Sequence, residues 1–131
     1  MVRRTIHVSS VGTDPLSISI DDRPFDSGPA RQLGSASPVE YFLISIAACF
    51  ALSCRMALAR RKRPGVPFEV TVLGIKALDP PSRLEVIDMD VRFPSDLADD
   101  AESIALQAKE LCTVTNTLTR APQPRVRVRT D

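Results

Sequence analysis

The three cysteines of the chain, Cys49, Cys54 and Cys112, are the residues whose chemistry could define its function. A thiolate is a nucleophile, and two neighbouring thiols can exchange electrons by forming a disulfide. Cys49 and Cys54 lie five positions apart in an apolar segment, so a helix would separate them by roughly 140° and about 7.5 Å. That pair cannot form a disulfide without breaking the helix. We therefore expect Cys54 to be core packing.

Cys112 closes an apolar stripe later in the chain and could face Cys49, which leaves two interpretations of Cys49 open. Cys49 is either a small core residue, since free cysteine is among the most buried residue types, or a reactive thiol paired with Cys112. A reactive Cys49 needs a lowered pKa, whereas burial within a helix raises the pKa of a thiol. A cation must then reach it, and Arg23 and Arg31 lie in the segment before the helix.

The segment that carries Cys49 begins with a strong helix-start pattern. Ser37, Pro38 and Glu40 form a capping box, in which the serine oxygen and the glutamate carboxylate each accept one unpaired backbone N–H. The pattern predicts one long central helix from Pro38 to about Lys62, ended by the basic run "RRKR" and a Pro-Gly pair. Its spacing favours a capping role for Glu40 over a catalytic one.

The other elements follow from alternating and helical periodicity. We expect a hairpin within residues 6–20, two strands at 66–78 and 83–93, a second helix opening at Ser95 and ending at Cys112, and a last strand at 125–129. In that last strand, "RVRVR", Val126 and Val128 would point inward and the arginines outward. The order ββ-α-ββ-α-β predicts an α+β fold with antiparallel sheets.

Length and composition limit the classes of protein and of function that remain possible. The chain has 131 residues and a net charge of +1, so we expect one domain spanning residues 1–131 and no general attraction to nucleic acid or membrane lipid. The longest apolar run stops at Arg55, which suits a buried helix, and no secretory signal is visible. With no CxxC and a single histidine, His7, we expect no metal and no other cofactor. Three cysteines without a disulfide pattern indicate a cytoplasmic protein.

Two stretches, "GSASPVEYFLISIAACFALSCRMAL" and "AKELCTVTNTL", resemble the two cysteine motifs of the OsmC/Ohr family. The family's first motif is a Pro-Glu helix start that runs into an Ala-Cys core, and its second is a Cys-Pro-Val-Ser-like run before the last strand. The two cysteines are 63 positions apart (112 − 49), in keeping with that family. The predicted element order resembles the family across essentially the whole chain.

The resemblance implies a thiol-dependent peroxidase that reduces organic hydroperoxides in oxidative or osmotic stress defence. Cys49 would match the peroxidatic cysteine, which becomes a sulfenic acid, and Cys112 the resolving cysteine that closes a disulfide. A dithiol reductant would reopen that disulfide. The resemblance also implies an intertwined homodimer with active sites at the subunit interface and the long helices packed centrally.

The sequence departs from the family pattern at several positions. Val39 occupies the place of the glutamate that follows the helix-start proline, and Glu40 comes one position later. Thr113 replaces the proline after the second cysteine, and Arg31 lies near one family position for the activating arginine without falling on it. Arg31 and Glu40 are therefore supporting candidates beside Cys49 and Cys112. These departures support an alternative function: a catalytically degenerate OsmC-like dimer that binds a small apolar ligand or senses redox state.

Overall fold

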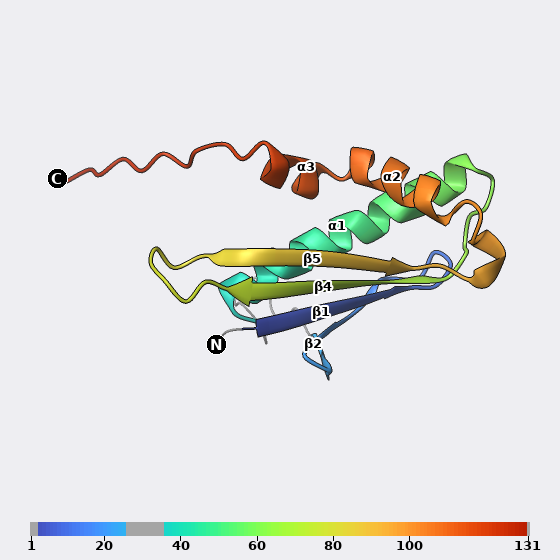
Figure 1. Ribbon diagram of the computed structural model, residues 1–131, viewed down its shortest axis with the longest axis horizontal. Helices are drawn as coiled ribbons and strands as arrows, with labels where there is room; N and C mark the ends of the chain where they lie inside the picture. Colours follow the sequence, from blue (N-terminus) through green and yellow to red (C-terminus); the bar gives the residue numbers. More distant parts are fainter. Residues whose placement is uncertain (1–2, 26–35, 131) are drawn as a thin grey trace.

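The fold is a five-stranded antiparallel sheet, a long helix packed on one of its faces, and two short helices on the far side of that helix (Figure 1). The structure is a computed structural model that describes residues 3–25 and 36–130. The strands, in the sheet order β3-β2-β1-β4-β5, are β1 (Arg3–Ser10), β2 (Ser17–Ile20), β3 (Arg23–Pro24), β4 (Phe68–Lys76) and β5 (Leu84–Arg92). The helices are α1 (Pro38–Arg60), the 3-10 turn η1 (Ser95–Leu97), α2 (Ala101–Leu111) and α3 (Thr113–Thr119).

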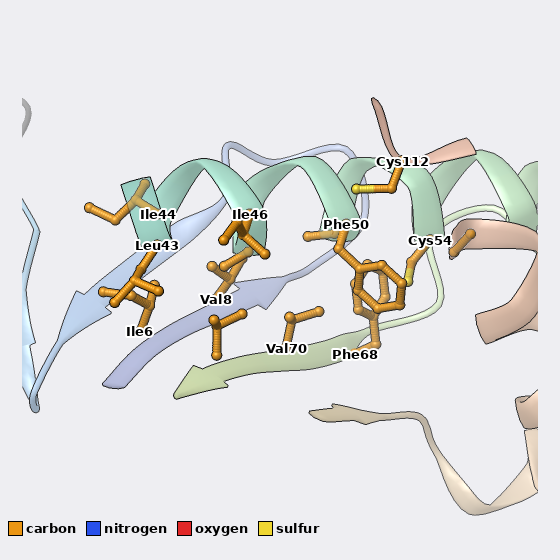
Figure 2. Close-up of a cluster of buried hydrophobic side chains, with 14 of the residues drawn as sticks. Ile6, Val8, Leu43, Ile44, Ile46, Phe50, Cys54, Phe68, Val70 and Cys112 are labelled. Atoms are coloured by element: carbon orange, nitrogen blue, oxygen red, sulfur yellow. The ribbon is translucent and has the colours of Figure 1, made fainter. Parts of the chain in front are cut away.

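The core lies between α1 and the central strands. Ile6 and Val8 of β1 pair with Val72 and Val70 of β4, and all four side chains are fully buried. Figure 2 shows Val8 and Val70 beneath α1, with Ile46 above them. Each such side chain contributes about 1.5–3 kcal/mol to folding through burial. The apolar residues that alternate along these two strands are therefore the ones through which the sheet packs against α1.

Helix α1 is more apolar than a surface helix. By length and composition it could cross a membrane, but 56% of its most apolar window is buried within the protein, as in the core helix of a soluble protein. Phe42, Leu52 and Met56 nevertheless keep 40%, 49% and 48% of their surface exposed. Together with Ser45 and Cys49 they follow 3- and 4-residue steps along one side of the helix, which we call the α1 stripe. Within one chain, the α1 stripe is only partly covered.

The α+β class and the antiparallel pairing are confirmed, and three details of the expected order are corrected. The second helix begins at Ala101, because Ser95 opens only the 3-10 turn. The segment after Cys112 forms the additional helix α3. The predicted strand at 125–129 is wrong for the single chain: residues 121–130 form no strand, and Val126 and Val128 are 87% and 85% exposed. A strand needs a neighbour to pair with, and this segment runs away from the sheet (Figure 1).

The start of α1 is fixed to the sheet by Glu40. The predicted capping box is present: Glu40 N–H donates to Ser37 Oγ at 3.2 Å, and Ser37 N–H donates to Glu40 Oε1 at 2.9 Å. The same carboxylate accepts from Arg4 Nε of β1 at 2.8 Å and from Arg23 Nη2 of β3 at 3.2 Å. Glu40 is 4% exposed. One buried carboxylate thus caps the helix and ties it to two strands.

The charge state of Glu40 follows from these contacts. Burial acts to raise the pKa of its carboxyl group, but the Ser37 N–H and the two guanidinium groups outweigh burial and hold the pKa below its ordinary value. Because the pKa of the folded state is depressed, the stabilising contribution is present above the unfolded-state pKa. It is lost as the pH falls through the lower, folded-state value.

Glu40→Gln should lower the free energy of unfolding by about 1–3 kcal/mol at pH 7, because two partly exposed arginines lose their charged partner. The variant should also lose less stability than the wild type below about pH 4.5, the ordinary pKa of the group. Urea denaturation between pH 3 and pH 7 measures both effects. The control Glu85→Gln, at an exposed position on β5, should behave as wild type. A Glu40→Gln profile parallel to that of the wild type would contradict this role.

Candidate functional site: a cysteine cluster between α1 and the α2–α3 junction

Cys49 lies on α1 where the helix passes the junction of α2 and α3. It is partly buried and packs against the core cluster. The Cys112 thiol is its hydrogen-bond partner, and the backbone N–H groups of Thr113 and Val114 also donate to it. The structure therefore brings the two thiols of the resembled motifs together, although they are far apart in the sequence.

Cys112 occupies the break between α2 and α3. Its backbone is extended (φ −82°, ψ 100°), so it ends one helix and begins the next. It is fully buried, and Figure 2 shows it on the side of α1 away from the strands, with its sulfur directed toward the helix. The Cys112 carbonyl accepts from Asn116 N–H at 3.0 Å and from Thr115 Oγ1 at 3.2 Å. These bonds fix the turn that presents its thiol to Cys49.

Helix α3 supplies the two backbone donors, and the sequence interpretation missed it. Its residues, TVTNTLT, are mostly β-branched and have low helix propensity, so periodicity alone does not indicate a helix there. The structure shows why it forms. Thr117 and Thr119 donate their hydroxyls to the carbonyls of Thr113 and Thr115, four residues earlier, and Thr115 is buried. Tertiary packing overrides the local preference.

The electrostatic environment of Cys49 disfavours its thiolate in the single chain. Burial raises the pKa of the Cys49 thiol, the N–H groups of Val114 and Thr113 lower it, and Cys112 raises it further. The net direction is upward from the ordinary value. Among the described residues, no cation contributes to this balance. Cys49 and Cys112 are thus close enough to interact, while the charge that would favour a reactive thiolate is not supplied by the described part of the chain.

Cys54 belongs to the same region without being placed to react. It is fully buried, and Figure 2 shows its side chain directed from α1 toward the sheet side. Burial, with a smaller contribution from the nearby Cys112, raises the pKa of Cys54 to about 12. Its thiol is therefore protonated at physiological pH and inaccessible to solvent. This environment agrees with the packing role predicted for Cys54.

The supporting residues named from the sequence lie elsewhere. Glu40 is nine positions before Cys49, which on a helix means roughly 13 Å along the axis and the opposite side. It binds Arg23, so the charge of Arg23 is engaged at the start of α1. Arg31 lies outside the described residues. The structure thus brings Cys49 and Cys112 together and leaves Glu40 apart from them.

Mild oxidation of the reduced protein should form an intramolecular disulfide between Cys49 and Cys112, leaving Cys54 as a free thiol, because only Cys49 and Cys112 are hydrogen-bond partners. Peptide mapping without reduction should recover the 49–112 linked pair. Cys112→Ser should abolish that product, and Cys54→Ser should leave it unchanged. Recovery of a 54–112 pair as the main product would contradict this assignment.

Comparison with known proteins identifies the fold and the family of the chain. A solved structure of an OsmC-like hydroperoxide resistance protein from Jannaschia sp. CCS1 superposes with a TM-score of 0.66 at 19% sequence identity, covering 98% of this chain and 93% of that one. A search of curated protein sequences found no significant match. The family model described as OsmC-like protein matches residues 31–127, a range that includes both Cys49 and Cys112. This chain is therefore a member of the OsmC-like protein family.

Proposed function

We propose that the protein is a thiol-dependent peroxidase that reduces organic hydroperoxides with Cys49 and Cys112. The observation that carries the proposal is the hydrogen-bonded contact of these two thiols at the α2–α3 junction. Membership of the OsmC-like family supports it, and the structurally similar protein is described as a hydroperoxide resistance protein. A cytoplasmic location fits a reaction that begins with reduced thiols.

The reaction consumes one hydroperoxide for each disulfide formed. The Cys49 thiolate attacks the terminal peroxide oxygen, the O–O bond breaks, and the alkoxide takes a proton and leaves as an alcohol. Cys49 is then a sulfenic acid. The Cys112 thiol attacks its sulfur, water leaves, and a disulfide joins the two residues. A dithiol reductant supplies two electrons and two protons to restore both thiols.

The proposal includes a homodimer, since the described residues of one chain supply only part of what the reaction needs. Cys49 belongs to the α1 stripe, whose exposed apolar members Phe42, Leu52 and Met56 are suited to contact with a second copy. A cation brought to Cys49 in the assembled protein would lower the pKa that burial raises. The nucleophile would then be activated by assembly.

Consumption of cumene hydroperoxide in the presence of dithiothreitol tests the function. The wild type should turn over, and Cys49→Ser should reduce the rate by roughly 100-fold or more, because the nucleophile is removed. Cys54→Ser is the matched control and should keep the wild-type rate. Cys112→Ser should still consume peroxide at first but accumulate sulfinic acid at Cys49, as its sulfenic acid has no resolving thiol. Equal rates for wild type and Cys49→Ser would exclude the peroxidase.

A second candidate is a catalytically degenerate dimer that binds a small apolar ligand or senses redox state. It is favoured by the raised pKa of Cys49 and by an apolar hollow of about 420 Å³ beside Val39, the residue at the family's glutamate position. The hollow is lined by Pro38, Val39, Phe42, Leu84, Ile87 and Leu118.

The acidity of Cys49 separates the two candidates. For the peroxidase we expect the alkylation rate of Cys49 by iodoacetamide, followed by mass spectrometry across pH 5–10, to give an apparent pKa at least one unit below that of an ordinary thiol. The same titration of the urea-unfolded protein provides the ordinary value. An apparent pKa at or above that reference would instead support the second candidate.

A further inference from the structure

The backbone break at Cys112 brings two N–H groups to the sulfur of Cys49. Thr113 and Val114 follow the break as the first two residues of α3, and the N–H groups of such residues have no acceptor within their own helix. Both donate to Cys49 of α1, against which α3 packs. Figure 2 shows the Cys112 sulfur directed toward α1 at this junction. The nucleophile of the proposed function therefore has two main-chain donors beside its resolving partner.

The donor at Thr113 is a feature of this sequence. The motif that the second cysteine stretch resembles has a proline directly after its cysteine, and a proline has no N–H to donate. Here Thr113 stands at that position, so the main chain gains a donor. The Thr113 side chain is exposed, and its hydrogen bond to Cys49 is made by the main chain. What matters to the sulfur is thus that residue 113 has an N–H.

The two N–H groups act on Cys49 from fixed positions. Burial raises the pKa of the Cys49 thiol, and the N–H groups of Val114 and, to a smaller extent, Thr113 lower it, because a hydrogen bond to the charged form favours that form. The carbonyl of Cys112 accepts from Asn116 N–H at 3.0 Å, which holds the break in place. The donors are therefore in position before the thiolate forms, and no reorganisation is needed to stabilise it.

We propose that the backbone N–H of Thr113 is a catalytic group of the peroxidase: it donates to the Cys49 sulfur and supports the negative charge of the thiolate that attacks the hydroperoxide. The N–H keeps its own proton throughout, and Cys49 loses its proton to solvent. The inference rests on the proposed function for its catalytic role. The hydrogen bond itself can be tested without any hydroperoxide.

Two substitutions at residue 113 separate the N–H from the side chain. Thr113→Pro removes both, whereas Thr113→Ala removes the side chain and keeps the N–H. The fold should accept the proline, since proline is favoured at the first position of a helix and Cys112 already has the extended backbone that a residue before proline adopts. Far-UV circular dichroism of both variants checks that the helices are retained.

We expect the apparent pKa of Cys49, measured by iodoacetamide alkylation, to be roughly 0.5–1 unit higher in Thr113→Pro than in Thr113→Ala, because the thiolate has lost one donor. At pH 7 the proline variant then has about threefold to tenfold less Cys49 thiolate. Its consumption of cumene hydroperoxide should be slower than that of Thr113→Ala in the same direction, since the thiolate is the nucleophile.

Amide NMR of the wild type provides a second measurement that requires no substitution at residue 113. The amide protons of Thr113 and Val114 should change chemical shift as Cys49 ionises, because their hydrogen-bond acceptor becomes charged. Cys49→Ser should remove this change. Thr119, at the other end of α3, is the control, and its amide shift should stay constant over the same pH range.

The outcomes distinguish this inference from the proposed function. Equal pKa values of Cys49 in Thr113→Pro and Thr113→Ala, or a Thr113 amide that does not respond to Cys49, would overturn the inference even if the wild type consumes hydroperoxide through Cys49. A wild type that consumes none, with variants that still differ in the pKa of Cys49, would overturn the proposed function and with it the catalytic role, but not the hydrogen bond.

Discussion

The structure depends on the burial of α1, a helix that is apolar on more than one side. One side packs on β1 and β4 and forms the core with Ile6, Val8, Val70 and Val72. A second side packs against α2 and α3. The α1 stripe, with Phe42, Leu52 and Met56, remains only partly covered. Each buried side stabilises the fold by removing apolar area from water. The apolar area of the α1 stripe that stays in contact with water makes no such contribution in one chain.

The ionised carboxylate of Glu40 and the thiol of Cys49 lie at different positions along α1 and on different sides of it. Glu40 sits on the sheet side at the start of α1, where two arginines and a backbone N–H keep its carboxylate ionised. Cys49 lies more than two turns later and faces Cys112, in surroundings where burial outweighs two backbone donors and raises the pKa of the thiol. A charge at Glu40 therefore stabilises the fold without acting on the thiol. Val39 and Glu40 are about 100° apart around α1, so Glu40 is buried against Arg4 and Arg23 whereas Val39 is 39% exposed.

The sequence predicted what depends on local chemistry or on strong periodicity. The capping box at Ser37 and Glu40, the extent of α1 and the alternation of β1 and β4 need only neighbours along the chain or one buried face. It did not predict α3, whose threonine-rich residues become helical through packing and side-chain bonds to carbonyls that form only in the folded chain. Nor could it place the ion pairs of Glu40, since Arg4 and Arg23 reach it from two strands. The strand at 125–129 was expected from alternation alone, and alternation says nothing about which chain supplies the neighbour.

Contact with a second chain would act on the thiol site as well as on stability. Cys49 belongs to the α1 stripe, so any partner that buries Phe42 and Leu52 also changes the surroundings of its sulfur. A partner that brought only apolar side chains would remove more water, raise the pKa of Cys49 further and leave the thiol unreactive. A partner that also brought a cation would lower that pKa and favour the thiolate. Under the proposed function, the charge carried by the covering surface, more than the thiol pair itself, would therefore decide between a peroxidase and a redox-silent protein.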